Sequence, residues 1–75
     1  MKDKRLKFFA VAAMTLVQLD IKFQYSNLYL KSDAFEMSLD RTDKSKIWIE
    51  NSDDGEWISF VMFDQFKSWL NKNLK

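Results

Sequence analysis

Two short runs of alternating apolar and polar residues flank the one glycine of the chain in the stretch IWIENSDDGEWISF, residues 47–60. Alternation with a period of two is typical of β-strands. The Asp54-Gly55 pair suits a type I′ hairpin turn, because both central residues of that turn need positive φ. With this turn, Ile49 lies opposite Phe60 and one face of the hairpin is apolar. The turn also sets Asp53 opposite Glu56, a like-charge pair, so a longer loop around Gly55 is the alternative. The stretch therefore predicts a hairpin with one face in the core.

The same alternation continues upstream and predicts an antiparallel meander. Asn27 tolerates positive φ, so a turn at Ser26-Asn27 is expected to set Phe23 opposite Leu30. Across the following turn, Leu30 is expected opposite Phe35. Because a slip of one residue at any turn would expose an apolar row, the agreement along the chain supports the meander. Strands are expected at about 15–25, 28–31, 35–40, 46–51 and 56–62, with Val17, Leu19, Ile21 and Met62 among the residues of the core face.

Helical spacing of apolar residues appears at both ends of the chain. It predicts one helix at about residues 3–14 and another at about 63–74. Asp64 near the start of the second helix and Lys72 near its end suit the helix dipole. The expected apolar stripes are Leu6, Phe9, Ala10, Ala13, Met14 and Val17 in the first helix and Phe63, Phe66, Trp69, Leu70 and Leu74 in the second.

These elements predict one α+β domain spanning residues 1–75. Its architecture is expected to be a five-stranded antiparallel β-meander with the N-terminal and the C-terminal α-helix packed on one face. Packing both helices against the apolar face of the sheet forms a single two-layer core. A chain of this length without Cys has no disulfide framework and must depend on that core for stability.

The N-terminal 17 residues also fit a second interpretation. Basic residues precede the apolar run FFAVAAMTLV, residues 8–17, as in a secretory signal sequence. The small residues that resemble a cleavage site, Ala10 and Ala12, lie inside this run rather than after it, which favours the helix. The run is too short to span a bilayer. We therefore expect a cytoplasmic protein, with a secreted small protein as the alternative.

Enzymatic and metal-dependent chemistry is not expected. Without His and Cys, the chain has neither the common catalytic triad nor a thiol nucleophile. A calcium loop starting at Glu50 would need a bidentate Glu at its twelfth position, where the chain has Val61. The lone glycine cannot form a phosphate-binding loop. We predict no enzyme activity, no metal and no cofactor.

The predicted register leaves aromatic residues on the polar face of the sheet. Trp48, Trp57 and Tyr29 point away from the predicted core, and Val61 lies on the same face. Exposed aromatic side chains on a sheet anchor a protein partner, stack nucleic-acid bases, or are covered by a loop or a second copy. We predict a non-enzymatic interaction protein that binds a protein partner with Trp48, Trp57, Tyr29 and Val61.

A homodimer and a single-stranded nucleic-acid-binding protein are the alternatives for this face. The net charge of +1 implies no general attraction to nucleic acid. Asp20, Glu36 and Glu50 on the predicted polar face would repel phosphate, which disfavours that alternative. Lys outnumbers Arg, and Asn, Ile and Phe are frequent, as is typical of AT-rich genomes. This composition suggests a bacteriophage accessory protein that acts in the host cytoplasm.

Overall fold

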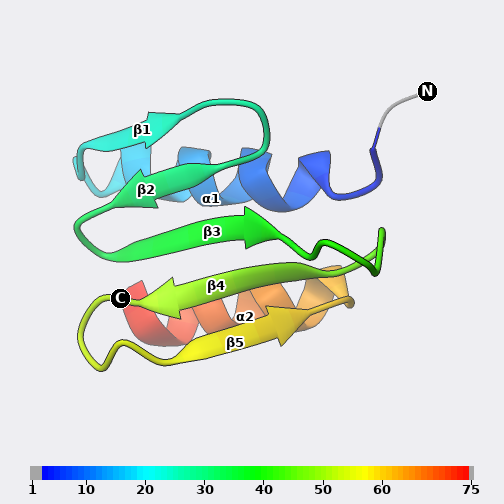
Figure 1. Cartoon of the computed structure of the whole chain (residues 1–75). Coiled ribbons are helices and arrows are strands. Elements are labelled where there is room, and N and C mark those ends of the chain that lie inside the picture. Colours follow the sequence, from blue (N-terminus) through cyan, green and yellow to red (C-terminus); the bar gives the residue numbers. More distant parts are fainter. Residues whose placement is uncertain (1–2, 75) are drawn as a thin grey trace.

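The computed structural model describes residues 3–74, and Figure 1 shows the elements in chain order. The helices are α1 (Leu6–Gln18) and α2 (Phe63–Leu74), and the strands are β1 (Phe23–Tyr25), β2 (Leu30–Ser32), β3 (Phe35–Leu39), β4 (Ile47–Asn51) and β5 (Trp57–Phe60). The sheet is antiparallel in the order β1-β2-β3-β4-β5. The predicted α+β meander with a helix at each end is confirmed. Residues 1, 2 and 75 of the predicted domain lie outside the described residues.

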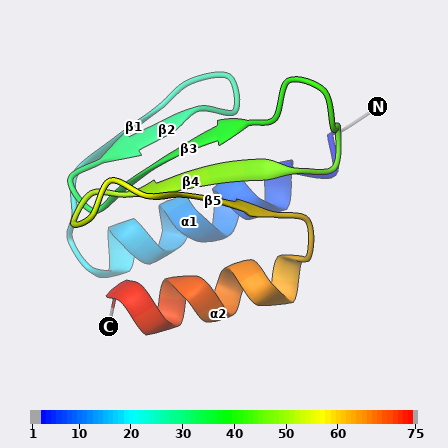
Figure 2. The same cartoon turned by 60° about the horizontal axis from the view of Figure 1, so that its bottom comes forward.

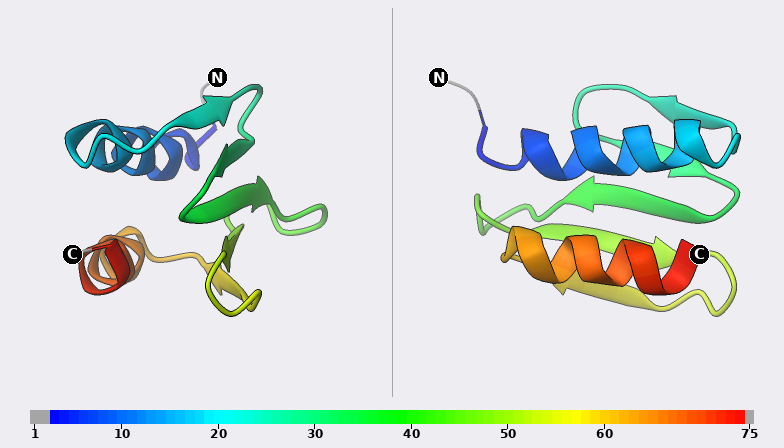
Figure 3. Two further views of the ribbon diagram at one scale, coloured as in Figure 1. Left: turned by 90° about the vertical axis from the view of Figure 1, so that its left-hand side faces the viewer. Right: turned by 180° about the vertical axis from the view of Figure 1, so that it is seen from behind.

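Both helices lie on the same face of the sheet, with α1 on the side of β1 and β2 and α2 on the side of β4 and β5 (Figures 2 and 3). The helices meet through Phe8, whose ring centroid lies 5.4 Å from that of Phe63 and 5.3 Å from that of Phe66. The buried hydrophobic residues form one layer between helices and sheet: Phe8, Phe9, Ala12, Leu16, Leu30, Phe35, Met37, Ile47, Ile49, Phe66 and Leu70.

Helix α1 begins and ends later than the sequence predicted, and its buried stripe is a different one. The buried residues of α1 are Phe8, Phe9, Ala12 and Leu16. Met14 and Val17, expected in the core, are 62% and 67% exposed. The sequence prediction ended the helix at residue 14, so Leu16 was assigned to a strand and the stripe that contains it was missed.

The C-terminus of α1 explains why only the last three residues of the expected strand 15–25 form a strand. The N–H of Asp20 donates to the carbonyl of Val17, and that of Ile21 donates to the carbonyl of Leu16. Asp20 has a φ of 58°, so these bonds form the Schellman pattern that ends helices. The strand therefore starts only at Phe23, and Leu19 is exposed instead of buried.

Each of the three hairpins whose register was predicted has a register two residues away from the predicted one. Phe23 lies opposite Ser32, Leu30 lies opposite Met37, and Ile49 lies opposite Ile58. Since side chains alternate with a period of two, a shift of two residues leaves every side chain on its predicted face. This is why the meander was predicted correctly although its turns were not.

The first hairpin turn has different residues at its centre from those expected, and the last hairpin has the longer loop around Gly55 that was the alternative. Asn27 and Leu28 have φ values of 49° and 59°, and Ser26 and Tyr29 exchange backbone hydrogen bonds around them. The first turn is therefore Asn27-Leu28, with two positive φ values as in a type I′ turn. In the last hairpin, the N–H of Asn51 donates to the carbonyl of Glu56, which leaves a four-residue loop, 52–55, instead of a two-residue turn.

The C-terminal part matches the prediction except where β5 ends. Helix α2 spans Phe63–Leu74, as expected, and it buries Phe66 and Leu70. Strand β5 ends at Phe60, and Met62 is 58% exposed rather than buried. Among residues 3–74, no helix has the length and apolar character that a bilayer crossing requires. Helix α1 supplies four of the eleven buried hydrophobic residues, so a chain that lost residues 1–17 as a signal would lose all four.

The end of α1 provides a test of the fold. Replacing Leu16 by Ala should lower the free energy of unfolding by roughly 2–4 kcal/mol, because it truncates a fully buried side chain. Val17→Ala is the matched control and should change it by less than about 0.5 kcal/mol, because this side chain lies in solvent. Urea unfolding followed by circular dichroism measures both values. A larger loss for Val17→Ala would favour the strand that the sequence predicted.

Candidate functional site

The face of the sheet opposite the helices has a mixed polar and aromatic surface. Its residues follow from the pairing of the strands, because partners opposite each other point to the same face. One row crosses the sheet as Gln24, Lys31, Glu36, Glu50 and Trp57, and a second row consists of Ser38, Trp48 and Ser59. We call these residues, together with Tyr29, the open face. Both helices lie on the other side (Figure 3).

The open face includes three of the four residues that the sequence predicted for partner binding. Trp57 is 46% exposed and Tyr29 is 39% exposed. Trp48 is half-buried and lies diagonally from Trp57, since Trp48 pairs with Ser59. The fourth residue, Val61, directly follows β5 at the margin of the sheet and is 47% exposed. Thus the two Trp residues are neighbours, whereas Val61 lies beyond the end of β5.

Trp48 is fixed on the open face by the loop that precedes β4. Its indole Nε1–H donates to Asp40 Oδ2 at 2.7 Å, and the ammonium of Lys46 lies 6.0 Å from the centroid of its ring. Asp40 Oδ1 accepts the N–H groups of Thr42 and Asp43 at 2.8 and 2.7 Å. The bond from the Asp43 N–H, followed by that from Trp48, lowers the pKa of Asp40 well below its usual range. The carboxylate therefore stays ionised and joins the loop to the Trp ring.

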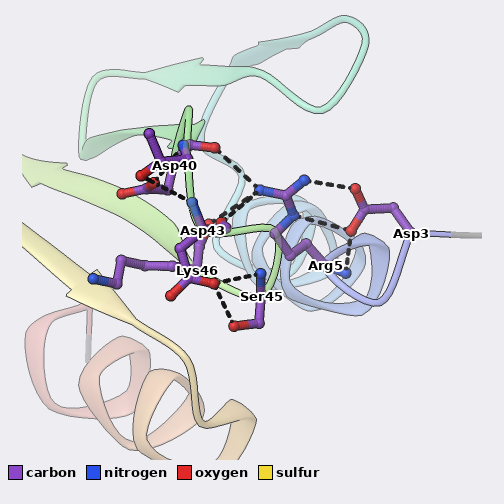
Figure 4. Close-up of polar contacts among 7 residues, drawn as sticks. Asp3, Arg5, Asp40, Asp43, Ser45 and Lys46 are labelled. Atoms are coloured by element: carbon purple, nitrogen blue, oxygen red, sulfur yellow. Dashed lines mark hydrogen bonds and ion pairs between the residues drawn. The ribbon is translucent and has the colours of Figure 1, made fainter.

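The loop 40–46 is itself held by Arg5, which is the one charged residue classed as buried within residues 3–74. Figure 4 shows the guanidinium between Asp3 and the loop. Arg5 Nε and Nη2 donate to the two carboxylate oxygens of Asp3 at 3.0 and 2.8 Å. Its Nη1 points at the carbonyls of Asp40, Asp43 and Lys46, at 3.3–3.4 Å. We call this arrangement the Arg5 clamp.

The clamp joins the start of the chain to the open face. Asp3 and Arg5 precede α1, whereas Asp40 follows β3 and holds Trp48 on β4. The bidentate contact with Arg5 lowers the pKa of Asp3 from 3.8 to about 2. A guanidinium forms such a fork because its donors have a fixed planar geometry, which an ammonium lacks. Arg5 therefore holds the loop 40–46, and this loop in turn positions Trp48 on the open face.

Sequence reasoning missed the clamp, because Arg5 was considered only as one of the basic residues that precede the apolar run 8–17. Backbone carbonyls accept most of the contacts to the loop, and carbonyls have no signature in a sequence. One signal was present: Asp40-x-Thr42 and Asp43-x-Ser45 are spaced as in Asx turns, which hold a loop in one conformation. In the structure both Asp side chains accept hydrogen bonds from the residues two positions later.

The charges of the open face differ from those of a nucleic-acid platform. Glu36 lies directly opposite Glu50, and Lys31 lies on the other side of Glu36. The Tyr29 hydroxyl donates to the Glu36 carboxylate. This bond, partial burial and the negative charges of Glu36 and Glu50 raise the pKa of Tyr29 above its usual value. Two neighbouring carboxylates thus occupy the centre of the surface, with aromatic rings around them.

Outside the open face, three features of the described residues bear on possible chemistry. Within residues 3–74, no group of three Asp, Glu, His or Cys side chains is placed to hold a metal ion. A hollow at the end of the β1–β2 hairpin is lined by Ile21, Phe23, Lys31 and their neighbours and lies apart from Trp48 and Trp57. The carboxylates of the loop 52–55 are partly used by the loop itself, since the side chain of Asp54 accepts the N–H of Glu56.

Comparison of the chain with protein-family models, curated proteins and solved structures finds no match.

The Arg5 clamp is testable by substitution. Arg5→Met should lower the free energy of unfolding by about 2 kcal/mol, because it leaves the Asp3 carboxylate and the loop carbonyls without their donor. Lys4→Met, at the exposed neighbouring position, should have an effect below about 0.5 kcal/mol. Chemical unfolding followed by circular dichroism measures both values. Equal stability of the two variants would mean that the clamp contributes nothing.

The lowered pKa of Asp3 predicts a pH dependence. Asp3 titrates at about 2 in the folded protein and near 3.8 in the unfolded chain, so its stabilising effect is full above pH 3.8 and is lost as the pH falls toward 2. Asp3→Asn should therefore be less stable than the wild type at pH 6, and the difference should shrink between pH 4 and pH 2. Urea titrations across this range measure the difference. Asp53→Asn, in an exposed loop, is the control, and a pH-independent difference for Asp3→Asn would contradict the assignment.

Proposed function

We propose that this protein is a non-enzymatic interaction module that binds a protein partner on its open face. The observation that carries the proposal is the exposed Trp57 beside Trp48 on a sheet face opposite both helices. Tryptophan and tyrosine dominate the binding energy of protein interfaces, because each buries a large area at a small entropic cost. Glutamates and a lysine among the rings would supply polar contacts at such an interface.

The arrangement of the aromatic side chains supports this function because it is largely fixed before binding. Trp48 is hydrogen-bonded to Asp40, and Asp40 belongs to the loop that Arg5 holds. Tyr29 is hydrogen-bonded to Glu36 on the neighbouring strand. Side chains held in place in the free protein lose less rotamer freedom when a partner binds, which favours affinity.

Single-stranded nucleic acid is the second candidate, and the charges of the open face disfavour it. Base-stacking surfaces combine aromatic rings with a positive groove that follows the phosphates. Here Glu36 and Glu50 lie at the centre of the face, with Lys31 as the neighbouring cation in the row. Two carboxylates repel phosphate, so a protein surface is the better match.

We also propose a source and a cellular compartment for this protein. The excess of Lys over Arg, together with the frequent Asn, Ile and Phe, supports a bacteriophage accessory protein acting in the host cytoplasm. Phage accessory proteins of this size would act by binding a host or phage protein rather than by catalysis. Secretion is the alternative, and it would require a role for residues 1–17 other than that of α1.

Affinity measurements with single variants test the proposal. A partner is first recovered on the immobilised full chain and purified, and its dissociation constant is then measured by calorimetry. Trp57→Ala should weaken binding on the order of thirtyfold, the effect of losing about 2 kcal/mol at an aromatic anchor. Met14→Ala is the control, because Met14 is also exposed but lies on α1, on the other side of the sheet.

A parallel titration separates the two candidates. Labelled single-stranded oligonucleotide should show no change in fluorescence anisotropy when the protein is added. Nucleic-acid binding that is lost in Trp57→Ala would instead establish the second candidate. Partner binding that is equally strong in Trp57→Ala and Met14→Ala would refute the role of the open face.

A further inference from the structure

The structure leaves the edge of β5 available for pairing. Strand β5 is the last strand of the sheet, and within residues 3–74 no element lies beyond it at that margin (Figure 1). The segment from Trp57 to Met62 contains neither a charged residue nor Pro. Proteins usually protect an exposed edge with charges, Pro or a very short strand. The opposite edge, β1, has only three residues, which leaves β5 as the less protected edge.

Backbone geometry identifies the groups that face this edge. The N–H of Asn51 donates to the carbonyl of Glu56, so these two residues form a hydrogen-bonded pair of the β4–β5 ladder. In an antiparallel ladder the hydrogen-bonded pairs alternate with pairs whose backbone groups point outward. The outward residues of β5 are therefore Trp57 and Ser59, and Val61 is the next in the series.

We propose that two copies of this chain pair through their β5 edges, antiparallel and about a two-fold axis at Ser59, to form one continuous ten-stranded sheet. With Ser59 opposite Ser59 of the second copy, Trp57 lies opposite Val61 of the second copy. This register uses the outward groups of all three residues, whereas a register shifted by two residues in either direction uses fewer of them. The inference concerns the edge of the sheet and does not depend on the proposed function of the open face.

The exposed side chains near the edge agree with this pairing. A two-fold axis perpendicular to the sheet keeps each face continuous, so Trp57 and Val61 of the two copies meet on the same face. Both are close to half exposed in the single chain, at 46% and 47%. An aromatic residue opposite a β-branched residue is a favourable cross-strand pair. Pairing therefore covers apolar surface that otherwise contacts water.

The charges at the two ends of β5 favour a second copy that pairs in antiparallel orientation. At one end of β5 the loop 52–55 and the next residue carry Asp53, Asp54 and Glu56, all exposed. At its other end Lys46 precedes Ile47, which pairs with Phe60, and Lys7 and Lys67 both lie against the ring of Phe63. These lysines outnumber Asp64, the acidic residue in the first turn of α2 at the same end. Antiparallel pairing brings the acidic end of each copy beside the lysine-bearing end of the other. Parallel pairing would bring the two acidic loops together.

Cross-linking tests the register directly, because the chain has no Cys of its own. Residues in a hydrogen-bonded antiparallel pair have Cα atoms about 5.5 Å apart, a separation that a disulfide spans. Ser59→Cys should therefore form a covalent dimer under mild oxidation. Ser38→Cys, in the same row of the open face but on β3, should not. A mixture of Trp57→Cys and Val61→Cys chains should form the mixed dimer in preference to either symmetric one.

Sedimentation equilibrium of the full chain tests the association without cross-linking. The wild type should have a mass near twice the 9.0 kDa of the chain. Ser59→Lys should weaken dimerisation at least tenfold, because it places two ammonium groups at the two-fold axis, whereas Ser38→Lys should not. A monomeric wild type would overturn the proposal, as would a dimer that is unaffected by Ser59→Lys. Equal cross-linking of Ser59→Cys and Ser38→Cys would also overturn it.

Discussion

One apolar layer between the sheet and two helices holds this small chain together. Helix α1 contributes Phe8, Phe9, Ala12 and Leu16, and α2 contributes Phe66 and Leu70 to the same layer. A chain of 75 residues without disulfides buries little surface, so it cannot divide its apolar residues between two faces of the sheet. Because both helices cover one face, the other face and the β5 edge remain in contact with solvent. The surfaces that we assign to binding follow from this constraint.

The residues that precede α1 hold a second part of the structure, the loop 40–46, in place. Arg5 lies at the junction between α1 and the loop 40–46, where it contacts three backbone carbonyls and the Asp3 carboxylate. A buried guanidinium is stabilising only when its donors are satisfied, and here they are. The same loop presents Asp40 to Trp48. Arg5 therefore connects α1, which packs in the core, with the loop that places Trp48 on the open face.

The sequence was sufficient for the fold class but not for its details. Alternation in strands predicted which face each residue of β3 and β4 occupies, and that prediction survived a register error of two residues at the three hairpins whose register was predicted. It failed at residues 15–22, where Val17, Leu19 and Ile21 alternate like a strand although Leu16 is buried in a helix. Helix and strand patterns overlap in short apolar runs, so the packing of Leu16 decided between them. For the site, Trp48 and Trp57 were identified from alternation alone, whereas the Arg5 clamp depends on carbonyls that no pattern reveals.

The central claim is that the structure leaves two specific surfaces free, the open face and the β5 edge, and that the edge is used by a second copy. Residue-resolved amide hydrogen exchange at low and high protein concentration tests this most directly. The account predicts that the amides of Trp57 and Ser59 become protected as the concentration rises, while that of Tyr25 on the β1 edge exchanges at an unchanged rate. Exchange of Trp57 and Ser59 that is independent of concentration, or new protection confined to Tyr25, would contradict it.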